Sequence, residues 1–322
     1  MDPARTVTKV RVIFLGGLGR SGTTLIERVL DELPGVRSAG ELIHVWQWGI
    51  LDDERCGCGE PFSECDFWRA VGQRAFGPPG WTRPLAQQML ELRSRVDRTR
   101  HLPQLMLTTA AHPRRRELAA YLDAYRDVYS AVADISGASV VVDSSKHSSL
   151  AFCLRHHDDI DVRVVHVVRD SRGVAYSWTK EMARPQAADG RQLMTRYSPV
   201  RAALLWDVDN ASLGILGRLG TPRLLLRYED FVTDPRAAVR RIANFAELPI
   251  TDRDLGFLGA GHVELGASHT VAGNPMRFQT GRIELRRDDA WREHLPRRQQ
   301  RLISALTAPL LSHYGYPLGV SA

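Results

Sequence analysis

The sequence predicts an α/β protein with a central, mainly parallel sheet of about five strands flanked by helices. Short runs rich in Val, Ile and Leu alternate with amphipathic segments, which is the pattern of strands joined by crossover helices. Each run ends in glycines or polar residues before a helix-like stretch, and the chain shows no internal repeat. The predicted strands cover residues 10–15, 36–39, 139–143, 162–168 and 221–227.

Amphipathic segments with a helical period fill the spaces between these strands. The segment 23–33 follows the first strand after a glycine loop, and further predicted helices cover 83–100, 113–134, 191–219 and 296–314. We expect one domain over residues 1–322, with helical insertions at about 42–135 and 182–219 that form a cap over the sheet. A chain of 322 residues with 43% hydrophobic content can bury a large core without disulfides or metals.

Composition excludes several classes of protein. The net charge is +6, but 43 basic residues are mixed with 37 acidic ones and form no basic arm, which argues against nucleic acid as a partner. The first apolar run is too short and too interrupted to cross a membrane or to act as a signal peptide, so we expect no stable membrane insertion. Four cysteines in a chain of this length fit a cytoplasmic protein. A homodimer remains compatible with the sequence.

A glycine-rich loop, GGLGRSGTT at residues 16–24, joins the first strand to the first helix. Backbone amides and hydroxyls at such a junction surround a phosphate at the positive end of the helix. The spacing from Gly17 nearly fits the loop of nucleotide triphosphatases, but Thr23 stands where that loop has its lysine. Arg20 supplies a positive charge from inside the loop instead, and its planar fork suits two oxygens at once.

This loop resembles that of the sulfotransferases that use 3′-phosphoadenosine 5′-phosphosulfate (PAPS), particularly the carbohydrate and tyrosylprotein branch, where it reads RSGTT or RSGSS. The resemblance implies a fold like that of the P-loop-containing nucleotide hydrolases and a single sulfotransferase domain. It also implies that the 5′-phosphosulfate of PAPS binds the loop residues Arg20, Ser21, Gly22, Thr23 and Thr24.

A second motif, HVVRDSRGVAYSW at residues 166–178, again joins a strand to a helix. In the family it resembles, the matching arginine and serine hold the 3′-phosphate of the donor, which implies this role for Arg169 and Ser177. An ion pair between Arg169 and Asp170 is the alternative. Tyr228, after the last strand, resembles a family residue near the donor.

Further along the chain, residues 269–277 resemble the family segment that folds over the bound nucleotide. Asn274 and Arg277 are the candidates for donor contacts there, and a plain surface loop is the alternative.

In-line sulfuryl transfer needs a base for the acceptor proton and cations for the growing negative charge. Glu41 follows the second strand in a Gly-Glu step that resembles the catalytic step of tyrosylprotein sulfotransferases, and Lys146 resembles a family lysine that contacts the transferring group. We therefore expect Glu41 as the base, with Arg20 and Lys146 as the cations. His44 and His147 are rival bases.

Cys56, Cys58 and Cys65 lie close together in the sequence. A structural zinc site usually has four ligands in paired spacings, so three thiols form an incomplete set. We therefore expect no metal, and either buried thiols or a labile disulfide between Cys65 and one of the other two.

The predicted function is transfer of a sulfuryl group from PAPS to a hydroxyl of a small-molecule or glycan acceptor, without a metal. Two alternatives are a P-loop kinase that uses ATP and magnesium, which the missing lysine disfavours, and a nucleotide-binding protein without catalysis. The acceptor would lie among residues 42–112 and 182–197. Trp46 and Trp48 could stack on a sugar or a phenol there, or pack in the core.

Overall fold

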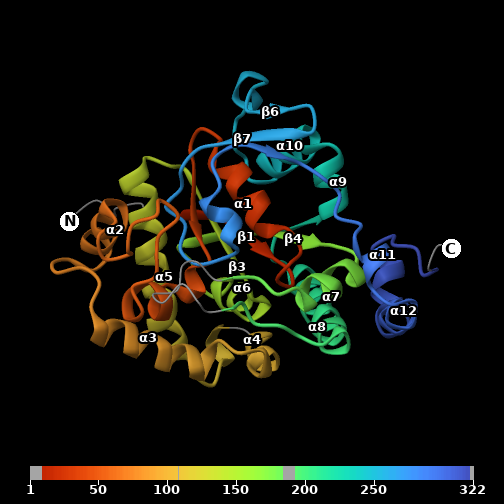
Figure 1. Cartoon of the computed structure of the whole chain (residues 1–322). Coiled ribbons are helices and arrows are strands. Elements are labelled where there is room, and N and C mark those ends of the chain that lie inside the picture. Colours follow the sequence, from red (N-terminus) through yellow and green to blue (C-terminus); the bar gives the residue numbers. More distant parts are fainter. Residues whose placement is uncertain (1–8, 108, 184–192, 320–322) are drawn as a thin grey trace.

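The computed structural model describes residues 9–107, 109–183 and 193–319. A five-stranded parallel sheet in the order β2-β3-β1-β4-β5 runs through the centre of the molecule (Figure 1). The predicted α/β class is therefore confirmed, and each predicted strand is found within a few residues. The strands are β1 (Val10–Gly16), β2 (Val36–Gly40), β3 (Val140–Lys146), β4 (Ile160–Val168) and β5 (Arg223–Arg227).

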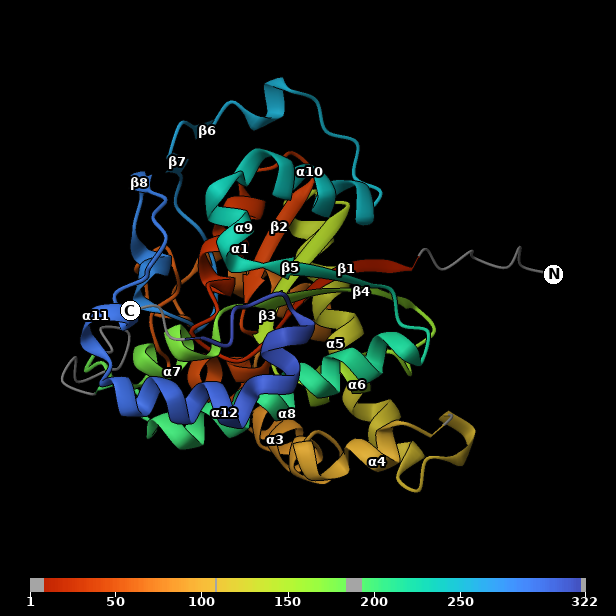
Figure 2. The same ribbon diagram turned by 90° about the vertical axis from the view of Figure 1, so that its right-hand side faces the viewer.

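Helices cover both faces of this sheet, as the alternation of side chains along each strand requires. In β1, Val12 and Phe14 face one core and Ile13 and Leu15 face the other. The first core is closed by α5 (Arg115–Ser136), α6 (Ser148–Leu154) and α8 (Pro199–Arg218). The second core is closed by α1 (Thr23–Asp31), α9 (Tyr228–Thr233) and α10 (Pro235–Phe245), on the opposite side of the sheet in Figure 2.

The insertion predicted at 42–135 contains two layers. Its last helix, α5, packs directly against the sheet, because Leu118, Tyr125 and Val132 join the core of β1 and β3. The helices α2 (Asp66–Phe76) and α3 (Arg83–Val96) pack on the outside of α5, and the short α4 (Leu102–Leu105) packs on α6. Part of the expected cap is therefore one of the layers that sandwich the sheet.

The second predicted insertion differs at its start. Residues 184–192 lie outside the described residues, and α8 begins only at Pro199, where Ser198 accepts a hydrogen bond from the Arg201 amide. Proline at the first helical position and a serine cap are a strong start signal. The prediction of a helix from residue 191 was therefore too long at its N-terminus.

The C-terminal third adds elements that the sequence pattern did not predict. A small antiparallel sheet contains β6 (Leu258–Gly259), β7 (His262–Leu265) and β8 (Gly281–Glu284). The chain then forms the short α11 (Trp291–His294) and α12 (Arg297–His313). The helix α12 confirms the one predicted at 296–314, and it packs against α8 and α7 (Ser171–Thr179). In the described parts of the chain, no helix has both the length and the apolar character needed to cross a membrane.

Candidate active site

A cavity of about 1000 Å³ opens at the carboxyl ends of the strands of the large sheet. Ligands bind at this edge in open α/β sheets because loops and helix N-termini converge there. Ser21 and Arg277 are the predicted site residues that do not line the cavity. The predicted residues that do line it are Arg20, Gly22, Thr23, Thr24, Glu41, Lys146, Arg169, Ser177, Tyr228 and Asn274, together with the rival bases His44 and His147.

The glycine-rich loop turns sharply into α1 beneath this cavity. Gly22 has φ of 90°, and a Cβ there would lie 2.2 Å from the Tyr228 ring, so only glycine fits. α1 begins at Thr23, and the first amides of a helix have no acceptor within it. Ser21, Thr23 and Thr24 are all buried, but only the two threonines line the cavity, beside the helix N-terminus.

Arg20 extends from the loop toward two methionines. Its guanidinium lies 2.7 Å from Sδ of Met182 and 3.4 Å from Sδ of Met194, over the ring of Trp178. Thioether sulfurs are weak acceptors, and burial lowers the pKa of Arg20 although the charge of Glu41 opposes that shift. A desolvated cation with such weak partners would gain much from an anionic ligand.

Arg169 occupies the end of β4 on another wall of the cavity. Its Nη1 donates to the Arg20 carbonyl at 3.1 Å and its Nη2 to the Asp288 carboxylate at 3.0 Å. Asp170 instead accepts two hydrogen bonds from the guanidinium of Arg172. The alternative of an ion pair between Arg169 and Asp170 was therefore wrong. An anion at Arg169 would compete with the partly exposed Asp288.

Glu41 and Lys146 form an ion pair at the ends of β2 and β3. Lys146 has φ of 69° and also donates to the carbonyl of Ser144 at 3.2 Å. The Glu41 carboxylate makes no helix-capping hydrogen bond, although the residue stands at the N-terminal end of a 3₁₀ turn, Leu42–His44. Its carboxylate is therefore directed at the cavity cation and not at the backbone.

The two histidines lie on the same side of the cavity. His44 Nε2 is 3.7 Å from the Glu41 carboxylate, and the ring stacks on Trp48 with centroids 3.7 Å apart. His147 is open to the cavity, while the surrounding protein, Arg93 and Lys146 lower the pKa of its imidazole. A lowered pKa makes His147 a weak proton acceptor.

Residues 266–274, here called the strap, form backbone hydrogen bonds with the segment that contains Glu41. The Glu41 amide donates to the Val271 carbonyl at 2.7 Å, and the Val271 amide donates to Ala39 at 3.0 Å. Gly40 has φ of 83°, and a Cβ there would lie 2.3 Å from the Val271 oxygen. The strap thus extends the end of β2 and fixes the backbone from which Glu41 projects.

Asn274 and Arg277 end this region differently. Asn274 lines the cavity, but its side-chain oxygen accepts from the Met276 amide and caps a 3₁₀ turn, Pro275–Phe278. Arg277 is buried, and its guanidinium donates to the carbonyls of Thr270 and Arg55. In this structure Arg277 therefore binds backbone and has no access to the cavity.

Two buried carboxyl groups that the sequence analysis did not assign to catalysis support the site. Glu27 of α1 accepts hydrogen bonds from Ser38 and Ser144, and burial raises its pKa to about 7. Asp143 accepts from Tyr129 and from Ser145, whose hydroxyl in turn accepts from the Ile43 amide. Asp143 therefore orients the turn after Glu41. Glu27 gave no motif signal.

Apolar and aromatic side chains line the remaining part of the cavity. Trp48 is at the wall, whereas Trp46 is fully buried in the core among Phe76, Trp81 and Tyr125. The stacking role considered for Trp46 was therefore wrong. Further apolar lining residues include Trp178, Met182, Met194, Tyr197, Leu205 and Val208.

The fold and this cavity together define an α/β enzyme of the P-loop-like class, with its first glycine-rich loop and Arg20 in the cavity wall. Residues 11–265 match the family model described as the sulfotransferase domain. The chain belongs to this family and is a sulfotransferase.

Two solved structures have the same fold over nearly the whole chain. The sulfotransferase domain of the Synechococcus PCC 7002 olefin synthase is 20% identical with a TM-score of 0.54, covering 97% of each chain. The sulfotransferase domain from the curacin biosynthetic pathway is 16% identical with a TM-score of 0.52, covering 97% of this chain and 99% of that one. No curated protein matches the sequence.

Proposed function

We propose that this protein transfers a sulfuryl group from PAPS to a hydroxyl of a small-molecule or glycan acceptor, as a single domain over residues 1–322. One observation carries the proposal: a single cavity contains an arginine from each of the two loops and a carboxylate paired with a lysine. Arg20 lies at one loop, Arg169 at the other, and Glu41 is paired with Lys146. Members of the sulfotransferase family use PAPS as donor.

The donor would bind across the carboxyl ends of β1 and β4. The hydroxyls of Thr23 and Thr24, the α1 N-terminus and Arg20 suit the 5′-phosphosulfate. Arg169 and Ser177 suit the 3′-phosphate, which would replace Asp288 as the anion at Arg169. The Arg169 guanidinium lies over the Tyr228 ring, 5.0 Å from its centroid, and this contact would help to hold Arg169 in place for the 3′-phosphate.

Transfer would proceed in line. The acceptor oxygen attacks sulfur, the bond from sulfur to the bridging phosphate oxygen breaks, and 3′-phosphoadenosine 5′-phosphate (PAP) leaves. Glu41 takes the acceptor proton, while Lys146 and Arg20 stabilise the charge on the sulfuryl and leaving oxygens.

The apolar wall indicates the kind of acceptor. Trp48, Trp178 and Tyr197 offer ring faces, and two methionines beside Arg20 offer adaptable apolar contact. An acceptor with an apolar or aromatic body and one reactive hydroxyl fits this wall, and a sugar ring could stack on the same faces.

An acceptor screen tests the proposal directly. Purified protein is incubated with sulfur-35 PAPS and a panel of phenols, glycans, lipids, nucleosides and polyketides, and labelled products are identified by mass spectrometry. We expect acceptor-dependent transfer that persists in EDTA and is unaffected by magnesium. Phosphate transfer from ATP that requires magnesium would instead support the kinase alternative, and PAP binding without transfer to any acceptor would support a non-catalytic protein.

A further inference from the structure

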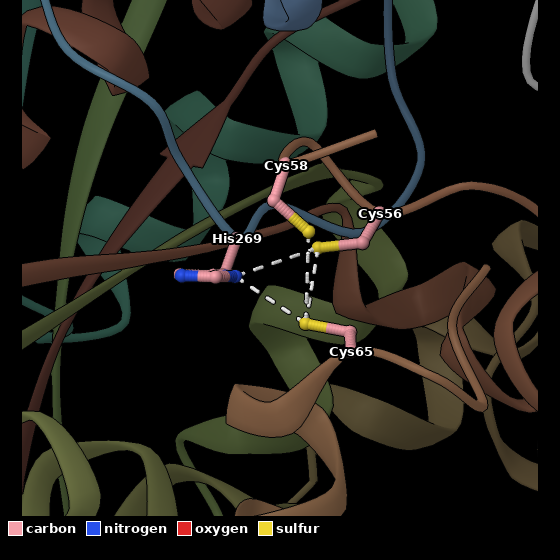
Figure 3. Close-up of side chains that lie close together, drawn as sticks. All are labelled: Cys56, Cys58, Cys65 and His269. Atoms are coloured by element: carbon pink, nitrogen blue, oxygen red, sulfur yellow. Dashed lines mark hydrogen bonds between the residues drawn. The ribbon is translucent and has the colours of Figure 1, made fainter. Parts of the chain in front are cut away.

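Three cysteines and one histidine meet behind the strap, outside the cavity lining. Cys56 and Cys58 come from the loop after residue 52, Cys65 immediately precedes α2, and His269 comes from the strap more than 200 residues later. Figure 3 shows the three sulfurs and Nδ1 of His269 converging on one point. All four ligand atoms lie within 4.8 Å of one another. The incomplete set of three thiols expected from the sequence is thus completed by His269.

The separations fit a tetrahedral metal site. Zinc binds sulfur at about 2.3 Å and nitrogen at about 2.0 Å, so a tetrahedron requires ligand atoms about 3.5 to 3.8 Å apart. Cys65 Sγ lies 3.6 Å from Cys56 Sγ, 3.8 Å from Cys58 Sγ and 3.3 Å from His269 Nδ1, and Cys56 Sγ lies 3.9 Å from the same nitrogen. All three cysteines are free, so the disulfide expected as one alternative is absent in this structure.

The surroundings favour a metal held by thiolates. Cys56 and Cys65 are buried, while Cys58 and His269 are partly buried. Zinc with three thiolates and a neutral imidazole carries one net negative charge, and the buried guanidinium of Arg277 lies beside it. Arg277 donates to the carbonyls of Arg55 and Thr270, the direct neighbours of Cys56 and His269. The positive charge of Arg277 therefore lies next to the cluster, where it would offset the net negative charge of the zinc and its thiolates.

The same contacts connect the cluster to Glu41. The Gly57 amide donates to the Thr270 carbonyl at 3.0 Å, and Trp68 Nε1 donates to the His269 carbonyl at 2.7 Å. Val271, two residues after His269, exchanges backbone hydrogen bonds with Ala39 and Glu41. Fixing His269 therefore fixes the strap that holds Glu41.

We propose that Cys56, Cys58, Cys65 and Nδ1 of His269 bind a structural zinc ion that fastens the strap to the cysteine loop. Four protein ligands fill a tetrahedron and leave no open position, which makes this a structural site separate from the reacting atoms. Tetrahedral S₃N coordination favours zinc among the abundant divalent metals. The site does not depend on the proposed donor or acceptor, and its metal content can be measured without activity.

Zinc content of the full chain, purified under reducing conditions after growth with added zinc, tests the proposal. We expect about one zinc per chain, and a loss of at least tenfold in Cys65→Ser and His269→Ala. Cys153→Ser is the matched control, because Cys153 is also buried but is not among the four residues whose ligand atoms meet, and this variant should retain its zinc. Cobalt in place of zinc should give the strong visible bands of a tetrahedral thiolate site.

If the variants do not fold, an experiment on the wild-type protein alone can still test the proposal. Titration of its thiols with a mercurial should release the zinc, which a colorimetric chelator detects, and should lower the melting temperature. Wild-type protein that remains free of zinc after incubation with equimolar zinc and reductant would overturn the proposal. Equal zinc loss in Cys153→Ser and Cys65→Ser would also overturn it. So would a disulfide at Cys65 that persists in protein purified under reducing conditions.

Discussion

The two sides of the cavity differ in how their residues are brought together. On the proposed donor side, residues 16–24 and 166–178 each lie in one continuous stretch of strand, loop and helix, and each loop has its own arginine. On the side of Glu41, the carboxylate follows β2, its lysine follows β3, and the strap reaches it from beyond residue 265. The proposed donor side is built from residues close together in the sequence. The side of Glu41 forms only when segments far apart in the sequence fold together. Damage to the second side should therefore affect catalysis and stability without removing the donor site.

Replacement of Glu41 tests this separation with the largest expected effect. Glu41→Gln keeps the shape of the side chain but removes the proton acceptor, so acceptor-dependent PAP release should fall by about a hundredfold to ten-thousandfold. The affinity for PAP, measured by calorimetry, should barely change. A near-normal rate in Glu41→Gln, together with a large loss in His44→Gln or His147→Gln, would move the role of base to that histidine.

Replacement of Arg169 is the matching test on the donor side. Arg169→Ala removes a charged donor, so PAP binding should weaken by roughly 1.5 to 3 kcal/mol, or about ten- to 150-fold. Asp288→Asn removes the carboxylate that competes for Arg169, and it should leave PAP binding equal or tighter. Unchanged affinity in Arg169→Ala would show that the 3′-phosphate does not bind there.

Glu27 links the two sides, and its titration predicts a pH effect on stability. Burial raises the pKa of Glu27 to about 7, so the folded protein keeps this proton after the unfolded chain has lost its own. The contribution of protonated Glu27 to the free energy of unfolding is fully present below about pH 4.3. It is lost as the pH rises to about 7, which lowers the free energy of unfolding by about 3 kcal/mol.

Denaturant unfolding of wild type and Glu27→Gln from pH 5 to 8 measures this contribution. Glutamine keeps partners for Ser38 and Ser144 but does not ionise. The stability of the variant relative to wild type should therefore increase with pH and level off above about pH 7. A constant difference across this range would show that Glu27 does not titrate in it.

Trp48 gives the smallest predicted effect and tests the acceptor wall. Trp48→Ala removes a ring that lines the cavity and stacks on His44, so KM for an acceptor found in the screen should rise several-fold, about 1 kcal/mol. PAP affinity should stay the same. A change in PAP affinity equal to the change in acceptor KM would place Trp48 on the donor side.

The local side of the cavity could be predicted from the sequence. Each of the two loops proposed to bind the donor directly follows a run of β-branched residues, so its place in the fold and its polar residues are both visible in one short stretch of sequence. The same applies to the large sheet, whose central strands β1, β3 and β4 are continuous apolar runs. Glu41 and Lys146 were identified through the family resemblance, and the structure brings them into an ion pair.

The assembled side could be predicted only in part, because its signals lie far apart in the chain. His269 is separated from Cys65 by more than 200 residues, so no spacing rule connects it to the thiols. Arg277 was a candidate for a donor contact, yet its guanidinium is buried and donates to two backbone carbonyls. The strands β6, β7 and β8 have two to four residues each, too few for an alternating pattern to appear.

Binding of PAP compared with ADP tests the central claim most directly, because the two nucleotides differ in the 3′-phosphate that Arg169 and Ser177 are proposed to hold. At equal concentration, PAP should raise the melting temperature by several degrees while ADP has little effect. Calorimetry should give at least tenfold tighter binding of PAP, a preference that is lost in Arg169→Ala. Equal shifts and equal affinities for the two nucleotides in the wild type would contradict the account of the donor site.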